Sequence, residues 1–295
     1  MKLLNFGSLN IDRIFPVAHV LRPGESMAAA DPEILAGGKG LNQSVAASRA
    51  GLPVFHAGKV GADGLFLLQE LEDAGVDTRY IHVDTEVPSG CAYIQVEPDG
   101  RNSMLICPGA NHTLSQEQIT QTLADFAPGD LLLLQNETNL TAFLVETAKA
   151  RGMKIAYNPS PITDTALSMD YSLIDLLLVN EEEAAALCGA KLPAKEALKK
   201  LCARCPGIVV LTLGEQGAYG ALDSSVEFVP ACAVKAVDAT GAGDTFTGYL
   251  LWALSNGKGL AEAMETAAKA AALTVTRTGA ANAIPTREQV ESALF

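Results

Sequence analysis

The middle of the chain alternates between short apolar runs and segments with helical periodicity. Apolar runs cover residues 131–135, 154–158, 176–179 and 208–213, and amphipathic patterns cover 115–126, 140–151, 181–187 and 194–202. Continuous apolar strands separated by helices are typical of a parallel sheet that is covered by helices on both faces. The pattern therefore predicts an α/β fold with a mostly parallel central sheet.

The amino-terminal third contains the same kinds of element and two departures from them. Strands are predicted at 3–9 and 54–60, one helix from the end of the glycine tract at 37–40 to about residue 50, and another at 65–74. Residues 15–35 lack helical periodicity and contain Pro16 and Pro23-Gly24, whereas residues 91–107 form a hairpin pattern around Pro98-Asp99-Gly100. We expect these two excursions to form a small second sheet, in the way a lid over a binding site is built.

The carboxyl-terminal third is rich in helical patterns. A hairpin is predicted at 218–229, a strand at 234–237, and helices at 246–254, at 260–275 and from Arg287 onward. The strand at 234–237 leads into a turn that contains glycine. This region is therefore predicted to be a strand, a turn and a helix.

Composition narrows the class of protein. The 295 residues are 48% hydrophobic, 5% aromatic and 19% charged, which is typical of a globular α/β chain, and they fit one large domain or two smaller ones. The formal charge of −13 argues against nucleic acid and anionic membranes as partners. Because no apolar run approaches the roughly 20 residues of a membrane span and the first residues lack a signal-peptide core, we expect a cytoplasmic protein.

The six cysteines are scattered through apolar patterns. Cys202 and Cys205 form a lone C-x-x-C without a second pair at zinc-site spacing. This favours reduced core residues over a metal or redox site.

The turn before the 246–254 helix combines two glycines with a carboxylate. Its sequence is Asp238-Ala239-Thr240-Gly241-Ala242-Gly243-Asp244-Thr245-Phe246. The first N–H groups of a helix lack intrahelical partners and carry partial positive charge, and glycine lets an anion approach the backbone closely. A carboxylate would repel an anion that was merely bound there. The position of Asp244 is explained if it removes a proton from a hydroxyl group that attacks a bound phosphate.

A second glycine tract, Gly37-Gly38-Lys39-Gly40-Leu41-Asn42, opens the helix predicted to run to about residue 50, with Asn42 on its first turn. It is not a P-loop, because that motif needs a glycine at position 33 and a serine or threonine at position 40, where this chain has Glu33 and Gly40. The later tract is not a dinucleotide fingerprint either, since Phe246 stands in the place of the third glycine. The second tract is either a ligand-binding loop or a helix start that packs against a strand.

Polar residues recur just after the predicted strands. They are Asn10 with Asp12, Glu137, Asn158, Asn180 with Glu183, and Thr212 with Gly214. Ligands bind at the carboxyl edge of open parallel sheets, so the recurrence predicts a binding site at this edge. For Asn10-Ile11-Asp12 alone, a turn held by side-chain hydrogen bonds explains the pattern equally well.

Taken together, the two glycine tracts and the polar edge resemble the ribokinase, or PfkB-type, family of carbohydrate kinases. Gly37-Gly38-Lys39-Gly40-x-Asn42 is similar to the family's amino-terminal motif and residues 238–246 to its carboxyl-terminal motif, in the same order. The likeness runs from end to end and is greatest to the ribokinases within the family. It implies one domain, residues 1–295, with a three-layer α/β/α sandwich and a β-sheet lid from about 13–36 and 88–108 that is often used for dimerisation.

The resemblance also implies roles for individual residues. Asp244 would take the proton from the sugar's primary hydroxyl, and the backbone N–H groups of Gly241, Ala242 and Gly243 would bind the transferring phosphoryl group. Residues that would bind the sugar are Asn10, Asp12, Gly38, Lys39, Asn42 and Glu137. Those that would serve the nucleotide and Mg²⁺ are Asn180, Glu183 (through water), Thr212, Gly214, Gly217 and Gly243. Those that would hold K⁺ are Asp238, Thr240, Thr274, Arg277, Gly279 and Ala283.

The implied activity is ATP-dependent transfer of the γ-phosphoryl group to the 5-hydroxyl of D-ribose, with Mg²⁺ and K⁺, by a homodimer joined through the lid. Two departures weaken the assignment to ribose: Ala283, where ribokinases commonly carry a hydroxyl, and Ala268, where a larger side chain can touch adenine. Deoxyribose, a fructose-like sugar or a nucleoside is the alternative acceptor. A catalytically inactive sugar-binding relative is disfavoured, because such a protein should have lost Asp244 or the two glycines.

Overall fold

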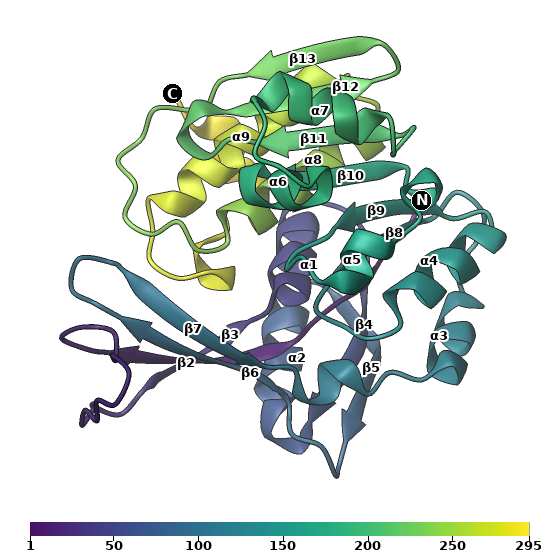
Figure 1. The fold of residues 1–295 in the computed structure, drawn as a ribbon. Helices are drawn as coiled ribbons and strands as arrows, with labels where there is room; N and C mark the ends of the chain where they lie inside the picture. The colour runs from purple at the N-terminus through teal and green to yellow at the C-terminus, as the bar shows by residue number, and fades with distance from the viewer. Residues whose placement is uncertain (295) are drawn as a thin grey trace.

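A nine-stranded sheet runs through the computed structural model, which describes residues 1–294 (Figure 1). Its strands are β1 (Leu3–Phe6), β4 (Val54–Gly61), β5 (Asp77–Asp84), β8 (Leu131–Gln135), β9 (Lys154–Asn158), β10 (Leu176–Asn180), β11 (Ile208–Thr212), β12 (Ala218–Leu222) and β13 (Ser225–Val229). The order across the sheet is β13-β12-β11-β10-β9-β8-β1-β4-β5. Neighbours are parallel from β11 to β5, and the hairpin β12–β13 adds an antiparallel edge. The predicted mostly parallel sheet is confirmed.

Helices cover both faces of this sheet. They are α1 (Lys39–Ala50), α2 (Leu65–Asp73), α3 (Gln116–Leu123), α4 (Thr141–Ala150), α5 (Asp164–Ser168), α6 (Glu181–Cys188), α7 (Ala194–Cys202), α8 (Ala242–Ser255), α9 (Leu260–Val275) and α10 (Arg287–Ser292). Side chains alternate between the faces of a strand, so Leu131 and Leu133 pack with α1, α2, α8, α9 and α10, and Leu132 and Leu134 pack with α3, α4, α6 and α7. Two cores separated by one sheet give the three layers.

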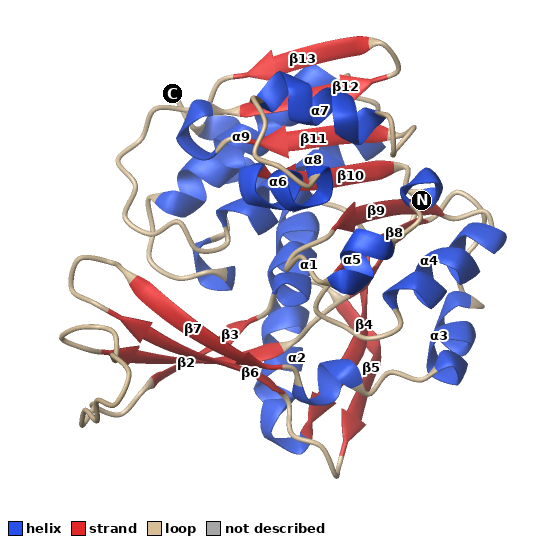
Figure 2. Cartoon of the chain, in the orientation of Figure 1, coloured by secondary structure: helices blue, strands red, loops and turns tan. Residues whose placement is uncertain are grey.

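A second sheet of four strands extends away from the main body beside α1 and α2 (Figure 2). Its order is β3 (Glu33–Gly37), β2 (Asn10–Pro16), β6 (Gly90–Val96) and β7 (Asn102–Cys107), with β2 and β6 parallel and the outer pairs antiparallel. The small second sheet is confirmed. However, Asn10 and Asp12 lie on a strand of this sheet, because the first main-sheet strand ends at Phe6 rather than Leu9.

The strand predicted at 234–237 is wrong. Residues 230–241 form neither helix nor strand, and the N–H groups of Val237 and Asp238 donate to the carbonyl of Val275 at the end of α9. The valines in this segment favour a strand, but a strand also needs a neighbour to bond with. The glycine turn therefore follows an irregular segment.

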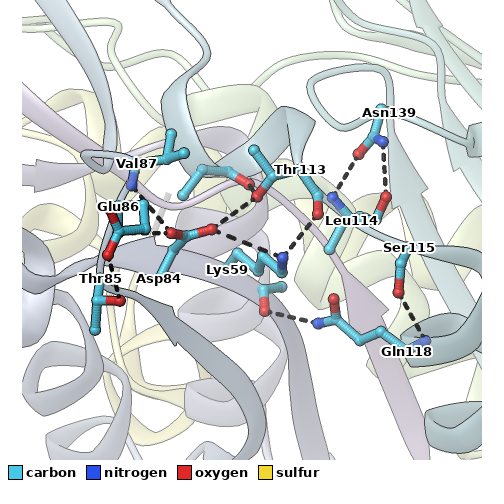
Figure 3. A network of polar contacts seen from close by, with 12 residues as sticks. Lys59, Asp84, Thr85, Glu86, Val87, Thr113, Leu114, Ser115, Gln118 and Asn139 are labelled. Carbon is cyan, nitrogen blue, oxygen red and sulfur yellow. Dashed lines mark hydrogen bonds and ion pairs between the residues drawn. The ribbon is translucent and has the colours of Figure 1, made fainter.

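Polar contacts fix the place where the second sheet joins the main body (Figure 3). Lys59 on β4 donates to the carbonyl of Thr113 at 2.7 Å and lies 3.8 Å from the Asp84 carboxylate. Asp84 in turn accepts the N–H groups of Glu86 and Val87, at 3.0 Å each. The Lys59 side chain thus connects the segment at Asp84, which leads into the second sheet, with the segment at Thr113, which returns from it.

The cysteines differ in burial: Cys91, Cys188 and Cys205 are buried, Cys202 and Cys232 are half-buried, and Cys107 is exposed, so the core location predicted for them holds only in part. All six cysteines are free, and burial raises the pKa of the Cys205 thiol to about 11, which fits a core residue. Within residues 1–294, no helix combines the length and the hydropathy that a membrane crossing requires.

Candidate active site

A cleft of about 240 Å³ lies where β9, β10 and β11 end and α8 begins. Its lining includes the predicted site residues Lys39, Asn180, Glu183, Thr212, Gly241, Gly243 and Asp244, together with Asn158. The structure thus brings both glycine tracts and the polar edge of the sheet to one place. A cavity of about 630 Å³ between α7 and the β12–β13 hairpin is larger, but none of the predicted residues lines it.

Asp244 occupies the first turn of α8 and is held by two side-chain amides. The helix begins after Gly241, whose φ of 75° is in the left-handed region that favours glycine. Asn42 donates to Oδ2 of Asp244 at 3.0 Å, and Gln43 donates to Oδ1 at 2.9 Å. Each carboxylate oxygen keeps a lone pair that can accept a proton.

The backbone beside Asp244 offers unpaired donors and open space. Within residues 1–294, the N–H groups of Gly241 and Gly243 have no hydrogen-bond partner, and that of Ala242 makes a long bond of 3.3 Å to the carbonyl of Ala239. A Cβ placed on Gly243 would meet no atom within 4 Å. Free donors at a helix start, next to empty space, suit a phosphoryl group.

Lys39 is a charged group surrounded by carboxylates. Burial alone would lower the pKa of its ammonium, but Asp244, Glu137 and Glu183 outweigh burial and raise it above its ordinary value. The backbone N–H of Lys39 donates to Oε2 of Glu137 at 3.0 Å, and the Ser8 hydroxyl donates to the same oxygen. Oε1 of Glu137 remains available to a hydroxyl group.

The predicted sugar-binding residues lie next to this cleft. Burial, together with the charge of Glu137, raises the pKa of Asp12 to about 7. Asn111 donates to the amide oxygen of Asn10 at 2.8 Å, so the nitrogen of Asn10 can point at a ligand. Oδ1 of Asn42 is buried and has no partner within the described residues, as expected of an acceptor whose donor is a ligand.

Replacing Asp12 with asparagine should stabilise the fold increasingly as the pH rises. Between pH 4 and 7 the folded chain retains a proton on Asp12 that the unfolded chain has released, so wild-type stability falls relative to the variant across this window. Above pH 7 the difference in the free energy of unfolding between variant and wild type should level off. Its size should be roughly 2–4 kcal/mol, because a pKa shift of about three units corresponds to about 4 kcal/mol. Urea denaturation of both proteins at pH 5 and 8 measures it. Equal differences at the two pH values would contradict the raised pKa.

Asn180 and Glu183 form the amino-terminal cap of α6. The Asn180 side chain accepts the N–H of Glu183 at 2.8 Å, and Glu183 Oε2 accepts the N–H of Asn180 at 2.9 Å. This capping box is sufficient to explain both residues structurally. It also holds the Glu183 carboxylate at the cleft wall with Oε1 unbonded, where that oxygen could accept a hydrogen bond from a water molecule on Mg²⁺.

The two glycines after β11 do not line the cleft. Gly214 and Gly217 both have positive φ angles, of 55° and 121°. A Cβ on Gly217 would lie 2.1 Å from the carbonyl oxygen of Val229, so the β12–β13 hairpin itself requires glycine there. Their assignment to a nucleotide pocket stays a prediction.

Asp238 holds the glycine turn against the segment after α9. Burial opposes its charge, but hydrogen bonds from Thr240 and from the N–H of Gly279 keep its pKa below the ordinary value. The Arg277 guanidinium donates to the carbonyl of Ala283 at 3.4 Å. The Arg277 guanidinium therefore competes for the Ala283 carbonyl oxygen, one of the groups expected to hold K⁺.

Several polar residues that shape the site have no counterpart among the predicted ones. They are Asn5, Ser8, Gln43, Asn111 and Gln135, all buried. Only Gln43 carried a usable signal, because it directly follows Asn42 on the predicted helix. The others become part of the site through contacts between residues far apart in the chain.

Comparison with known proteins points to one family. The model of the pfkB family carbohydrate kinases matches residues 1–287. A ribokinase of Haemophilus influenzae is 35% identical over 294 residues, 96% of this chain and 95% of that protein, and a deoxyribokinase of Salmonella typhi is 32% identical, over 98% and 97%. The crystal structure of a Cryptococcus neoformans ribokinase in complex with ADP has a TM-score of 0.87 and 32% identity, over 99% of both chains.

Fold, site and comparisons define the class of protein as a phosphotransferase with a hydroxyl group as acceptor. Within this class, the chain belongs to the pfkB family of carbohydrate kinases.

Proposed function

We propose that the chain transfers the γ-phosphoryl group of ATP to the 5-hydroxyl of D-ribose. The observation that carries this proposal is the Asp244 carboxylate next to the unpaired N–H groups of Gly241 and Gly243. A base and an anion-binding backbone in one turn are the two parts that phosphoryl transfer to an alcohol requires. The ribokinase names of relatives at 32–35% identity support ribose as the acceptor.

In the proposed reaction, Asp12, Asn10, Asn42 and Glu137 bind the sugar and direct its primary hydroxyl toward Asp244. Asp244 accepts the hydroxyl proton as the oxygen attacks the γ-phosphorus, and the bond to the β-phosphate oxygen breaks. The N–H groups at the start of α8 and the ammonium of Lys39 stabilise the negative charge on the transferring group. ADP leaves, and the proton departs from Asp244 to solvent.

Two metal ions belong to the proposal. Glu183, with Asn180 beside it, would hold Mg²⁺ through water, and the ion would neutralise phosphate charge. K⁺ would lie behind the glycine turn, held by Asp238, Thr240, Thr274, Arg277, Gly279 and Ala283, mostly through backbone carbonyls. Its charge would support the anion-binding backbone from behind.

An assay of ADP release across free sugars and nucleosides, with and without K⁺, tests the function. Ribose should give the highest kcat/KM, and K⁺ should increase it. The deoxyribokinase relative makes deoxyribose the second candidate. Faster turnover of deoxyribose, a hexose or a nucleoside would replace ribose as the acceptor and leave the kinase chemistry in place.

The second sheet is proposed to be a lid and the site of homodimer contact within a one-domain chain. Its strand β7 is exposed along its whole length, with Met104, Leu105 and Ile106 between 44% and 66% exposed. Apolar side chains gathered on an exposed strand are typical of a surface that another molecule covers. Light scattering should give twice the chain mass; a monomer at micromolar concentration would contradict the dimer.

A further inference from the structure

Gln43 is a buried amide that the proposed reaction does not otherwise use. Its Nε2 donates two hydrogen bonds, one to the carboxylate Oδ1 of Asp244 at 2.9 Å and one to the amide Oδ1 of Asn158 at 3.1 Å. Its own oxygen accepts from Gln135 at 2.7 Å. All three polar partners of Gln43 are therefore side chains, and one of them is the proposed base.

The orientation of this amide is fixed by the groups behind it. If the Gln43 amide were flipped, its oxygen would face the Asp244 carboxylate, and its nitrogen would face the donor of Gln135. Asn158 cannot turn to accommodate the flip without losing its own bond to the carbonyl of Leu178, at 3.1 Å. Only one orientation satisfies every partner.

A row of hydrogen bonds continues from Gln135 and reaches the backbone carbonyls of Gly40 and Gly7, which have fixed positions. Gln135 also donates to Oδ1 of Asn5 at 3.1 Å, and Asn5 donates to the carbonyl of Gly40 at 2.7 Å and to Ser44 at 2.8 Å. Ser44 bonds to Nδ1 of His56, whose Nε2 faces the carbonyl of Gly7 at 3.2 Å.

The protonation of the two ring nitrogens of His56 determines which groups donate at this end of the row. A carbonyl only accepts, so Nε2 of His56 carries the proton and Ser44 donates to Nδ1. Burial lowers the pKa of His56 to about 4, which keeps the ring neutral and this arrangement constant at physiological pH. Each donor along the row thus has a defined direction, and the row ends on the Asp244 carboxylate.

We propose that Gln43 is a positioning residue for Asp244, held in its working orientation by Gln135 and Asn5. This inference rests on the proposed role of Asp244 as the base. Asn42 and Gln43 each bond to one carboxylate oxygen and so fix the plane of the carboxylate. A fixed plane keeps one lone pair directed at the sugar hydroxyl, and small errors in such geometry reduce rates strongly.

Gln43→Met is the direct test, because methionine has a similar length and no donor. We expect kcat to fall roughly 10–100-fold, the factor that corresponds to losing one hydrogen bond to a charged group. The dissociation constant of ribose, measured by calorimetry, should change less than threefold. Gln118→Met is the matched control: Gln118 is also buried, donates to the carbonyl of Gly58 and does not line the cleft, so its kcat should stay at the wild-type value.

A kcat within twofold of wild type in Gln43→Met would overturn the positioning role. So would a loss of kcat matched by an equal loss of ribose affinity, because that pattern belongs to sugar binding or folding. If Gln43→Met does not fold, Gln135→Met releases the Gln43 amide instead, and kcat should fall 3–10-fold with ribose affinity unchanged, on the order of one neutral hydrogen bond; an unchanged kcat would again overturn the role.

The proposed function and the positioning role fail in different ways. Wild-type protein that phosphorylates no acceptor in the panel refutes both. Active wild type with an active Asp244→Asn variant refutes the base. Active wild type, inactive Asp244→Asn and unimpaired Gln43→Met refute only the role of Gln43.

Discussion

Asp244→Asn should lower kcat by about 10²–10⁴-fold, the contribution of a well-placed general base. The amide has almost the same shape as the carboxylate but cannot take the hydroxyl proton. Ribose binding should survive, because Asn10, Asp12 and Glu137 remain. Steady-state kinetics and calorimetry on the same preparation measure the two effects separately. A variant that keeps more than a tenth of wild-type kcat would refute the base.

Asp238→Asn is the matched control for that experiment, since it changes a carboxylate in the same turn. Asp238 bonds to Thr240 and to the N–H of Gly279 and does not line the cleft. We expect kcat to fall less than tenfold, with a reduced response to K⁺. Equal losses in the two variants would mean that the turn as a whole, rather than Asp244, is what the reaction needs.

Gly243→Ala and Gly248→Ala should have opposite effects, although both place one methyl group on α8. A Cβ at Gly243 would stand in open space, and Gly243 lines the cleft in which we propose that the phosphoryl group binds. We expect kcat to fall about 10²-fold, comparable to losing a donor from an anion-binding backbone, with no loss of stability. Activity assays and thermal denaturation of the variant test both parts.

Gly248→Ala should destabilise the fold and change the reaction less. A Cβ there would lie 2.5 Å from Cβ of Ala46 and from the N of Ala47, on α1. These atoms cannot rotate away, so overpacking of about 1–3 kcal/mol should exceed the gain of up to about 1 kcal/mol from helix propensity. The melting temperature should fall by a few degrees. An unchanged melting temperature would show that α1 and α8 can separate at no cost.

The sequence predicted the elements whose formation depends on local pattern. The apolar strands β8 to β11 and the helices α1, α7 and α9 lie within a residue or two of their expected positions. Glycine turns and polar strand ends gave most of the cleft lining, because parallel strands bring their carboxyl ends to one edge whatever their order.

Features that depend on a partner could not be predicted in the same way. Residues 234–237 have strand-forming side chains and form no strand, because no neighbouring strand is there to bond with. The hydrogen bonds of Gln43 depend on residues far along the chain, because it bonds to Asp244 across 201 positions and to Gln135 across 92. A single sequence contains no sign of such pairs.

The helices α1 and α8, which bring Asn42 and Asp244 together, lie far apart in the chain and are synthesised at different times. Asn42, on α1, leaves the ribosome early, but its partner Asp244 follows 202 positions later. Domains fold as their chains emerge, and contacts of high sequence separation form late. The carboxylate that we propose as the base is therefore absent until translation is nearly finished. Because α8 and α9 also belong to one of the two cores, premature termination before α8 should remove part of that core together with the proposed base.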